Sequence, residues 1–165
     1  MFSAKSIANY FLELAQSSDQ CLSSLKLQAL VYYAHGWHTG YTGRALLNEK
    51  VQAGPYGLVI ASLYREFNRF GTGPITRKAL DYDAHGAQVT PSPKDKETQT
   101  LLRTVFQNYA SYSDTQLTQM AHGKDTPWDI TWRESKGMHG VNIPLSRITA
   151  YFKAAVHTAE QQADA

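Results

Sequence analysis

The sequence predicts a mainly α fold, a compact helical single domain (α+β in detail) in which one or two short β-hairpins interrupt a series of helices. Helix start signals made of serine, threonine or proline precede most segments whose apolar residues recur at helical spacing. Segments with strand character are few and short. A chain of 165 residues with 42% hydrophobic residues can bury one sizeable core. We therefore expect one domain over residues 1–157, followed by a flexible tail over 158–165.

The first helix is predicted over about residues 4–15. Ser3 precedes it, and a serine hydroxyl can accept a hydrogen bond from the first turn of a helix. The polar stretch 16–20 ends the helix. Apolar residues recur along it at i, i+4 and i+7, namely Ile7, Phe11 and Leu14.

A second helix is predicted from a cap at Ser23 or Ser24 to about Gly40. One apolar stripe consists of Leu27, Leu30, Val31, Ala34 and Tyr41. Further apolar residues cover much of the remaining surface, namely Leu25, Ala29, Tyr32 and Tyr33. Because a helix that is apolar nearly all round is buried, this helix is the expected centre of the domain.

The segment GRALLNEKVQAGP is the first candidate for β structure. It has a turn-like centre at Asn48-Glu49, which predicts a short hairpin there. Pro55 should stop this hairpin from extending, because proline cannot donate a hydrogen bond to a neighbouring strand.

A third helix is predicted over about 59–70, with Gly71 as its C-cap. Its apolar side consists of Leu63, Phe67 and Phe70. Residues 72–92 contain β-prone pieces around 81–86 and predict a second hairpin or an irregular excursion.

Three further helix starts follow, with the sequences SPKD, SDTQ and TPWD. The first places Pro93 at the first helical position, the second fits a capping box, and the third combines a threonine cap with a proline and an acid. The predicted helices cover about 93–110, 114–122 and 127–134. Pro144 then begins a last amphipathic helix, whose inward residues should be Ile148, Tyr151, Phe152 and Val156.

The run YYAHGWH raises the question of a metal site. His35 and His38 are i, i+3 neighbours and could share a metal ion, but no other histidines form a matching pair. The favoured interpretation is a buried histidine satisfied by a backbone or tyrosine group, with His38 on the inward stripe. Gly36 destabilises a helix unless another element packs against it, which predicts close helix packing. We expect neither a metal nor a cofactor.

A catalytic hypothesis centres on the segment AHGKDTPWD. His122 beside Asp125 and Asp129 would suit a general base with an orienting acid. The same residues also suit the end of one helix and the start of the next. Cys21 could act as a nucleophile only if a histidine folded onto it. Because motifs of hydrolases, zinc proteases and phosphate-binding loops are absent, we expect no enzyme.

Charge and hydropathy exclude other classes of protein. The 16 Lys and Arg are mixed with the 14 Asp and Glu along the chain, and without a basic block nucleic-acid binding is not expected. No apolar run reaches the roughly 18 to 20 residues that cross a bilayer, and the N-terminus lacks a signal-peptide layout. A single cysteine cannot form an internal disulfide. The expectation is a cytoplasmic protein without membrane association.

Five segments together resemble the Panacea domain of the SocA-like antitoxin family in their order and spacing. They are SAKSIANYFLELA, LKLQALVYYAHGWH, YGLVIASLYREFNRFG, LTQMAHGKDTPWD and IPLSRITAYF. The resemblance extends from Ser3 to about Lys153. This family is bacterial, phage-borne and cytoplasmic. The resemblance implies an antitoxin that binds and neutralises a cognate toxin encoded beside it.

The resemblance also implies which positions to examine for partner binding. Several of them should instead hold the scaffold, because motif residues shared among members with different partners are better explained that way. The positions are Lys26, Gln28 and Trp37 in the second helix, Tyr56, Tyr64, Arg65 and Glu66 around the third, and Trp128 and Asp129 in the PWD turn.

Two alternative functions stay open. One member type of the family is a proteolytic adaptor that delivers its toxin to an ATP-dependent protease, and a Clp-type protease could grip the small residues 163–165. The other alternative, of a different class, is a small enzyme that uses His122 and Asp129.

Three positions differ from the usual family pattern. A proline usually follows the YG pair and an aromatic residue precedes its tyrosine by two positions, but Leu58 and Gly54 occupy these positions, and Pro55 follows Gly54. This predicts a different loop geometry before the third helix, or a different partner. His35 stands where the family usually has glutamine, which further weakens the metal hypothesis.

Overall fold

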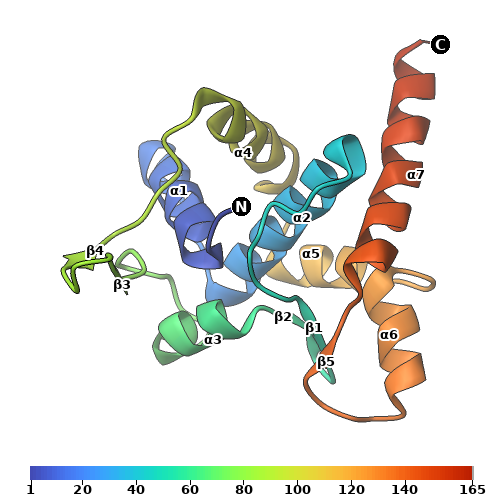
Figure 1. The fold of residues 1–165 in the computed structure, drawn as a ribbon, viewed down its shortest axis with the longest axis horizontal. Coiled ribbons are helices and arrows are strands. Elements are labelled where there is room, and N and C mark those ends of the chain that lie inside the picture. The colour runs from blue at the N-terminus through green and yellow to red at the C-terminus, as the bar shows by residue number, and fades with distance from the viewer. Residues whose placement is uncertain (165) are drawn as a thin grey trace.

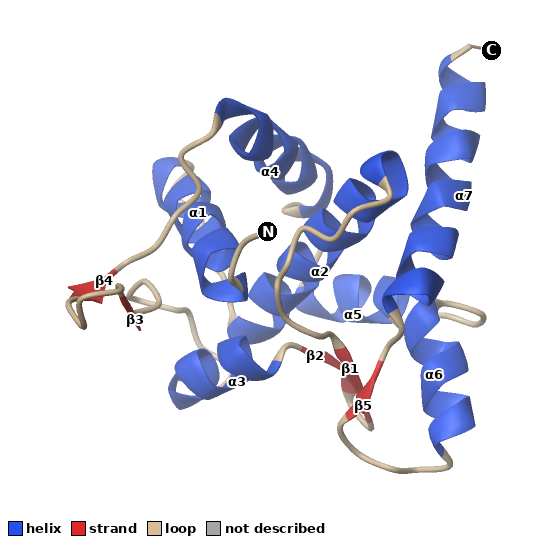
Figure 2. Ribbon diagram, viewed as in Figure 1, coloured by secondary structure: helices blue, strands red, loops and turns tan. Residues whose placement is uncertain are grey.

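One central helix, α2 (Ser24–Thr42), organises the fold. In the computed structural model, which describes residues 1–164, the other long helices surround it, and α7 is its most extensive neighbour (Figure 1). The helices around it are α1 (Ala4–Ser17), α3 (Ala61–Phe67) with the 3-10 turn η1 (Asn68–Phe70), α4 (Lys96–Tyr109), α5 (Asp114–Ala121), α6 (Pro127–Ser135) and α7 (Leu145–Ala163). Only short strands accompany them (Figure 2). The predicted mainly α fold is confirmed.

Local caps begin most of these helices where the sequence predicts. The Ser3 hydroxyl accepts from Ser6 N, and the Ser23 hydroxyl accepts from Lys26 N. Ser113 and Gln116 form the predicted capping box at α5. The Thr126 hydroxyl accepts from the backbone of the first turn of α6, whose first residue is a proline. Each contact satisfies a backbone N–H that the helix itself leaves unpaired.

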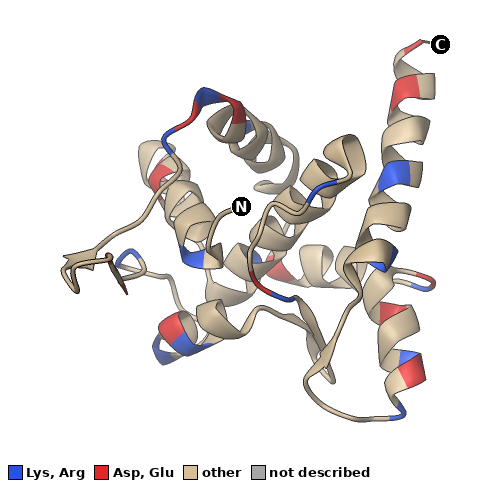
Figure 3. Ribbon diagram, in the orientation of Figure 1, with Lys and Arg blue, Asp and Glu red and all other residues tan. Residues whose placement is uncertain are grey.

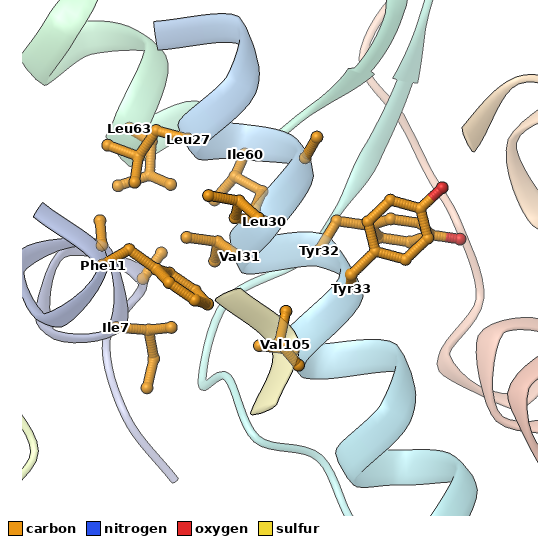
Figure 4. Close-up of a cluster of buried hydrophobic side chains, with 14 of the residues drawn as sticks. Ile7, Phe11, Leu27, Leu30, Val31, Tyr32, Tyr33, Ile60, Leu63 and Val105 are labelled. Carbon is orange, nitrogen blue, oxygen red and sulfur yellow. The ribbon is translucent and has the colours of Figure 1, made fainter. Parts of the chain in front are cut away.

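The core lies between α2 and the helices that cover it. Figure 4 shows Ile7 and Phe11 of α1, Leu63 of α3 and Val105 of α4 facing apolar residues of α2. From Leu27 to Gly36 every residue of α2 is buried, as expected for a helix that is apolar nearly all round. The prediction was wrong at the edges, because Tyr41 is 60% exposed and Tyr151 is 42% exposed.

The first hairpin lies further along the chain than predicted. Strand β1 (Gln52–Gly54) pairs antiparallel with β2 (Gly57–Val59), so the turn is Pro55-Tyr56 and not Asn48-Glu49. Pro55, expected to stop a hairpin, begins its turn because its fixed φ suits that position. On its other side β1 pairs with β5 (Val141–Asn142), a strand that the sequence did not predict.

Contact with the N-terminus explains why the predicted turn fails. Phe2 N donates to Leu46 O at 2.8 Å, and Asn48 N donates back to Phe2 O at 2.9 Å. These bonds hold the chain before β1 as a loop beside the start of α1. They join residues more than forty positions apart, which local turn chemistry cannot reveal.

The second hairpin is confirmed as a two-stranded sheet of β3 (Asp81–Tyr82) and β4 (Gln88–Val89). The start of α4 was predicted three residues too early. Its N-cap is Asp95, whose carboxylate accepts from Thr98 N at 2.9 Å, so Pro93 lies before the helix.

The last helix is longer than predicted. Pro144 precedes α7 as expected, and the helix continues to Ala163 through residues predicted to be a flexible tail. The domain boundary at residue 157 and the mobility of the tail stay predictions. Figure 3 shows positions of Lys and Arg interspersed with positions of Asp and Glu on several of the helices. No helix within residues 1–164 has the length and apolarity that crossing a membrane requires.

Candidate partner-binding surface

The nine motif residues separate by exposure into six that are at least partly buried and three that face solvent. Tyr56 is 93% exposed and Tyr64 is 54% exposed, and Arg65 is exposed beside Tyr64. Tyr56 lies in the turn between β1 and β2, whereas the other two lie on α3. The partly or fully buried ones are Lys26, Gln28, Trp37, Glu66, Trp128 and Asp129.

Two of the buried motif residues join the central helix to its neighbours. Gln28 is 7% exposed, and its Oε1 accepts from Ile60 N at 2.8 Å, just before α3. Lys26 Nζ donates to Ala110 O, at the end of α4. A buried N–H without a partner would destabilise the fold, so the Gln28 contact fixes the backbone at Ile60.

The two motif tryptophans serve as anchors between elements. Trp37 Nε1 donates to the Tyr109 hydroxyl at 2.8 Å and thereby connects α2 with α4. Trp128 Nε1 donates to Gly54 O at 3.1 Å, which connects α6 with the end of β1. Both indoles bury an apolar body and use their single donor inside the fold.

Glu66 holds the end of α3 against the following loop. Its Oε1 accepts from Leu80 N and from Arg77 Nη1, each at 3.1 Å, and Lys5 Nζ lies 3.7 Å from Oε2. Burial by itself would raise the pKa of Glu66, but the hydrogen bond from Leu80 and the two cations outweigh burial and lower the pKa. The carboxylate is therefore ionised near neutral pH and serves as a structural acceptor.

The proposed catalytic pair of His122 and Asp129 is not assembled as an acid and a base. His122 Nε2 accepts from Leu58 N at 3.0 Å, and the ring lies 4.7 Å from that of Trp128. Asp129 Oδ2 accepts instead from Asp125 N at 2.8 Å and from Arg133 Nε at 3.2 Å. Burial lowers the pKa of His122 to about 4, so the imidazole is neutral at pH 7 and its acceptor nitrogen is occupied.

The histidines of YYAHGWH are buried in the reverse order from the prediction. His35 is 3% exposed, and its Nδ1 accepts from Leu47 N over a long 3.4 Å. His38 is only partly buried, and its Nδ1 lies 2.9 Å from Arg44 O. Nowhere in residues 1–164 do three histidine, cysteine or acidic side chains gather closely enough to hold a metal ion. The contact to Leu47 makes His35 a histidine satisfied by backbone, as expected.

Beside Trp37 lies a surface feature that the sequence did not reveal. A cavity of about 450 Å³ opens there, and its lining includes Tyr41, Tyr109, Tyr112 and Met120. The sequence holds a partial signal, because Leu101, Val105 and Tyr109 repeat every four residues. A repeat identifies a helix face but not whether another element covers it.

Comparison with known proteins agrees with the resemblance seen in the motifs. The family model described as "Antitoxin SocA-like, Panacea domain" matches residues 27–129. The protein named Antitoxin SocA from Caulobacter vibrioides (strain NA1000 / CB15N) is 32% identical over 129 residues, which cover 77% of this chain and 69% of that protein. No solved structure matches the chain significantly.

Proposed function

The chain belongs to the SocA-like antitoxin family with a Panacea domain, and from this premise we propose that it neutralises a cognate toxin by direct protein–protein binding in the cytoplasm. Such a function requires a rigid scaffold with a complementary surface and needs no reactive group. The proposed contact residues are Tyr56, Tyr64 and Arg65. Tyrosine and arginine are among the residues that most often dominate interface energetics.

The observation that carries this proposal is the way the segment from Gly54 to Glu66 is held. Three side chains from other parts of the chain bind its backbone, and Glu66, at its end, binds the backbone of the neighbouring loop. Trp128 binds Gly54 O, His122 binds Leu58 N, Gln28 binds Ile60 N, and Glu66 binds Leu80 N. A segment fixed in this way presents its exposed side chains with little loss of conformational entropy on binding, which favours affinity.

The remaining motif residues support the same proposal indirectly. Lys26, Trp37 and Asp129 make their polar contacts within the fold. Their proposed contribution to binding is therefore indirect, because they hold α2 and α6 in position. On the same arrangement of helices, different exposed residues would suit toxins of different shape.

Co-expression in two hosts tests direct neutralisation against delivery to a protease. The toxin candidate is the product of the adjacent reading frame that arrests growth when expressed alone. If this chain restores growth equally in a wild-type host and in a host lacking Clp-type proteases, neutralisation is direct. Rescue that is lost in the protease-deficient host would reject direct binding and support the adaptor function.

A further inference from the structure

The three proposed contact residues are too few for a stable complex by themselves. A specific interface buries roughly 800 Å² on each partner. A fully exposed tyrosine side chain can bury roughly 150–250 Å². Because Tyr64 is only 54% exposed, Tyr56, Tyr64 and Arg65 together stay below the area of a specific interface. A toxin that binds tightly must therefore contact additional surface.

The cavity beside Trp37 has the composition of an interface core. Its lining contains no Asp, Glu, Lys, Arg or His, whereas four other cavities within residues 1–164 each include at least one Lys or Arg. Tyr41, Tyr112 and Met120 stay 60%, 38% and 40% exposed in it. Aromatic residues and methionine without charge are typical of the centre of an interface.

Internal contacts hold the aromatic side chains of this cavity in place. Trp37 donates to the Tyr109 hydroxyl and lies 5.6 Å from the ring of Phe152. Tyr109 also stacks on Tyr33, with ring centroids 4.2 Å apart and an interplanar angle of 12°. The cavity floor is thus ordered before any partner arrives, which reduces the entropy lost on binding.

The longest wall of the cavity is one face of a helix. On α4, the lining residues Leu101, Thr104, Val105, Asn108 and Tyr109 follow one another at i, i+3, i+4, i+7 and i+8. They form a continuous stripe about 12 Å long, given the rise of 1.5 Å per residue. Trp37 and Tyr41 border it from α2, and Ala159 borders it from the C-terminal half of α7, which projects beyond α2 (Figure 1).

We propose that this aromatic groove, lined by α2, α4, α5 and α7, receives the apolar, uncharged face of one helix of the cognate toxin. The inference rests on the proposed antitoxin function and names a second contact surface for it. A charged side chain inserted into the groove would lose its hydration and find no opposite charge there. Aliphatic side chains at helical spacing would instead bury apolar surface. Thr104 and Asn108 each donate to a backbone carbonyl of α4, and their side-chain oxygens can accept from a partner.

Charge insertion tests the groove. The purified chain is titrated with the growth-arresting product of the adjacent reading frame, and the Kd is measured for Tyr41→Glu and Thr104→Glu. Thr104 is exposed, so its replacement adds a charge without removing an apolar core contact. We expect each variant to weaken binding at least tenfold. Tyr82→Glu is the matched control, because Tyr82 is 68% exposed on β3 and lies outside the groove, and its Kd should stay within twofold of wild type.

Three other outcomes would overturn the inference. If Tyr41→Glu and Thr104→Glu both bind within twofold of wild type, the groove does not contact the toxin, although the antitoxin function stands. If wild type sediments as a dimer that Tyr41→Glu dissociates while toxin affinity is unchanged, the groove binds a second copy of this chain. If wild type itself does not bind the adjacent product, the proposed function and the groove fail together.

Discussion

Gly36 on α2 faces the ring of Phe152 on α7 so closely that a Cβ atom at position 36 would lie 2.2 Å from Cε2 of Phe152. One turn further on, a Cβ atom at Gly40 would lie 2.8 Å from the carbonyl carbon of Phe152. The missing side chains allow α7 to lie against the central helix. This packing is the predicted explanation for a glycine inside YYAHGWH.

Gly36→Ala should therefore destabilise the fold. Overpacking a filled core costs about 1–3 kcal/mol, which exceeds the gain of about 1 kcal/mol that alanine brings to a helix. Urea unfolding followed by circular dichroism measures the difference, and the smaller side chain of Phe152→Leu should restore part of the loss in the double variant.

Gly123→Ala is the matched control for that substitution. A Cβ atom at Gly123 would find its nearest neighbour at 3.6 Å, an ordinary contact distance. The free energy of unfolding should change by less than about 0.5 kcal/mol, as at most sites without packing conflict. Equal losses in both variants would show that the contact with Phe152 is not the cause.

Gln28→Ala should destabilise the protein by about 1–3 kcal/mol, because it leaves the buried Ile60 N–H without an acceptor. Gln107→Ala, at an exposed position of α4, is the control and should be nearly neutral. Thermal melts of both variants provide the comparison. If the two variants melt together, Gln28 does not fix the backbone before α3.

Stability should fall in mildly acidic solution because of His35. Burial lowers the pKa of His35 to about 4, with a smaller contribution from His38, whereas histidine in the unfolded chain has its ordinary pKa of 6.5. Between these values the unfolded state binds a proton that the folded state rejects. Stability from this residue is therefore full above pH 6.5 and decreases as the pH falls to about 4, by up to about 1.4 kcal/mol per pH unit.

His35→Gln provides the test of that pH dependence. Glutamine keeps an acceptor for Leu47 N but cannot be protonated in this range. Urea midpoints measured at pH 7.5, 6 and 5 should decline less steeply in the variant than in wild type. His122, whose pKa burial also lowers to about 4, should account for part of the remaining slope. Identical slopes in the two proteins would contradict a neutral buried His35.

Replacing Tyr56 and Arg65 together by alanine should weaken toxin binding without changing stability, since both side chains are exposed. Interface hot spots typically cost 2 kcal/mol or more when truncated, which corresponds to roughly a thirtyfold higher Kd. Calorimetric titration with the toxin measures it. The exposed Tyr82→Ala serves as control, and an unchanged Kd in the double variant would remove these residues from the interface.

The helices were predictable because their signals are local. Ser3, Ser23, Ser113 and Thr126 bind backbone within their own first turns, so each cap and its helix lie in the same few residues of sequence. The burial of α2 followed from composition in the same way. Periodicity could not predict where along α2 the surrounding helices stop covering the apolar stripe. Tyr41 continues that stripe, but it lies near the end of α2 and is largely exposed.

Local sequence patterns could not predict the β structure or the contacts that hold the segment from Gly54 to Glu66. The first hairpin was misplaced because the backbone N–H of Asn48 donates to Phe2 O and so is not free to form a hairpin turn. The strand β5 could not be predicted because two residues are too few to show a periodicity. The tethers from Trp128, His122 and Gln28 each join residues at least 32 positions apart, the shortest separation being that of Gln28 and Ile60. The sequence identified Gln28, His122 and Trp128 as candidate functional residues, but it could not identify the backbone groups that they bind.

Reconstitution from purified components tests direct neutralisation most directly. The chain and the growth-arresting product of the adjacent reading frame are mixed without ATP and without any protease, and both complex formation and toxin activity are followed. We predict a complex of fixed stoichiometry in which the toxin is inactive. A toxin that stays free and active until a Clp-type protease and ATP are added would contradict neutralisation by binding alone.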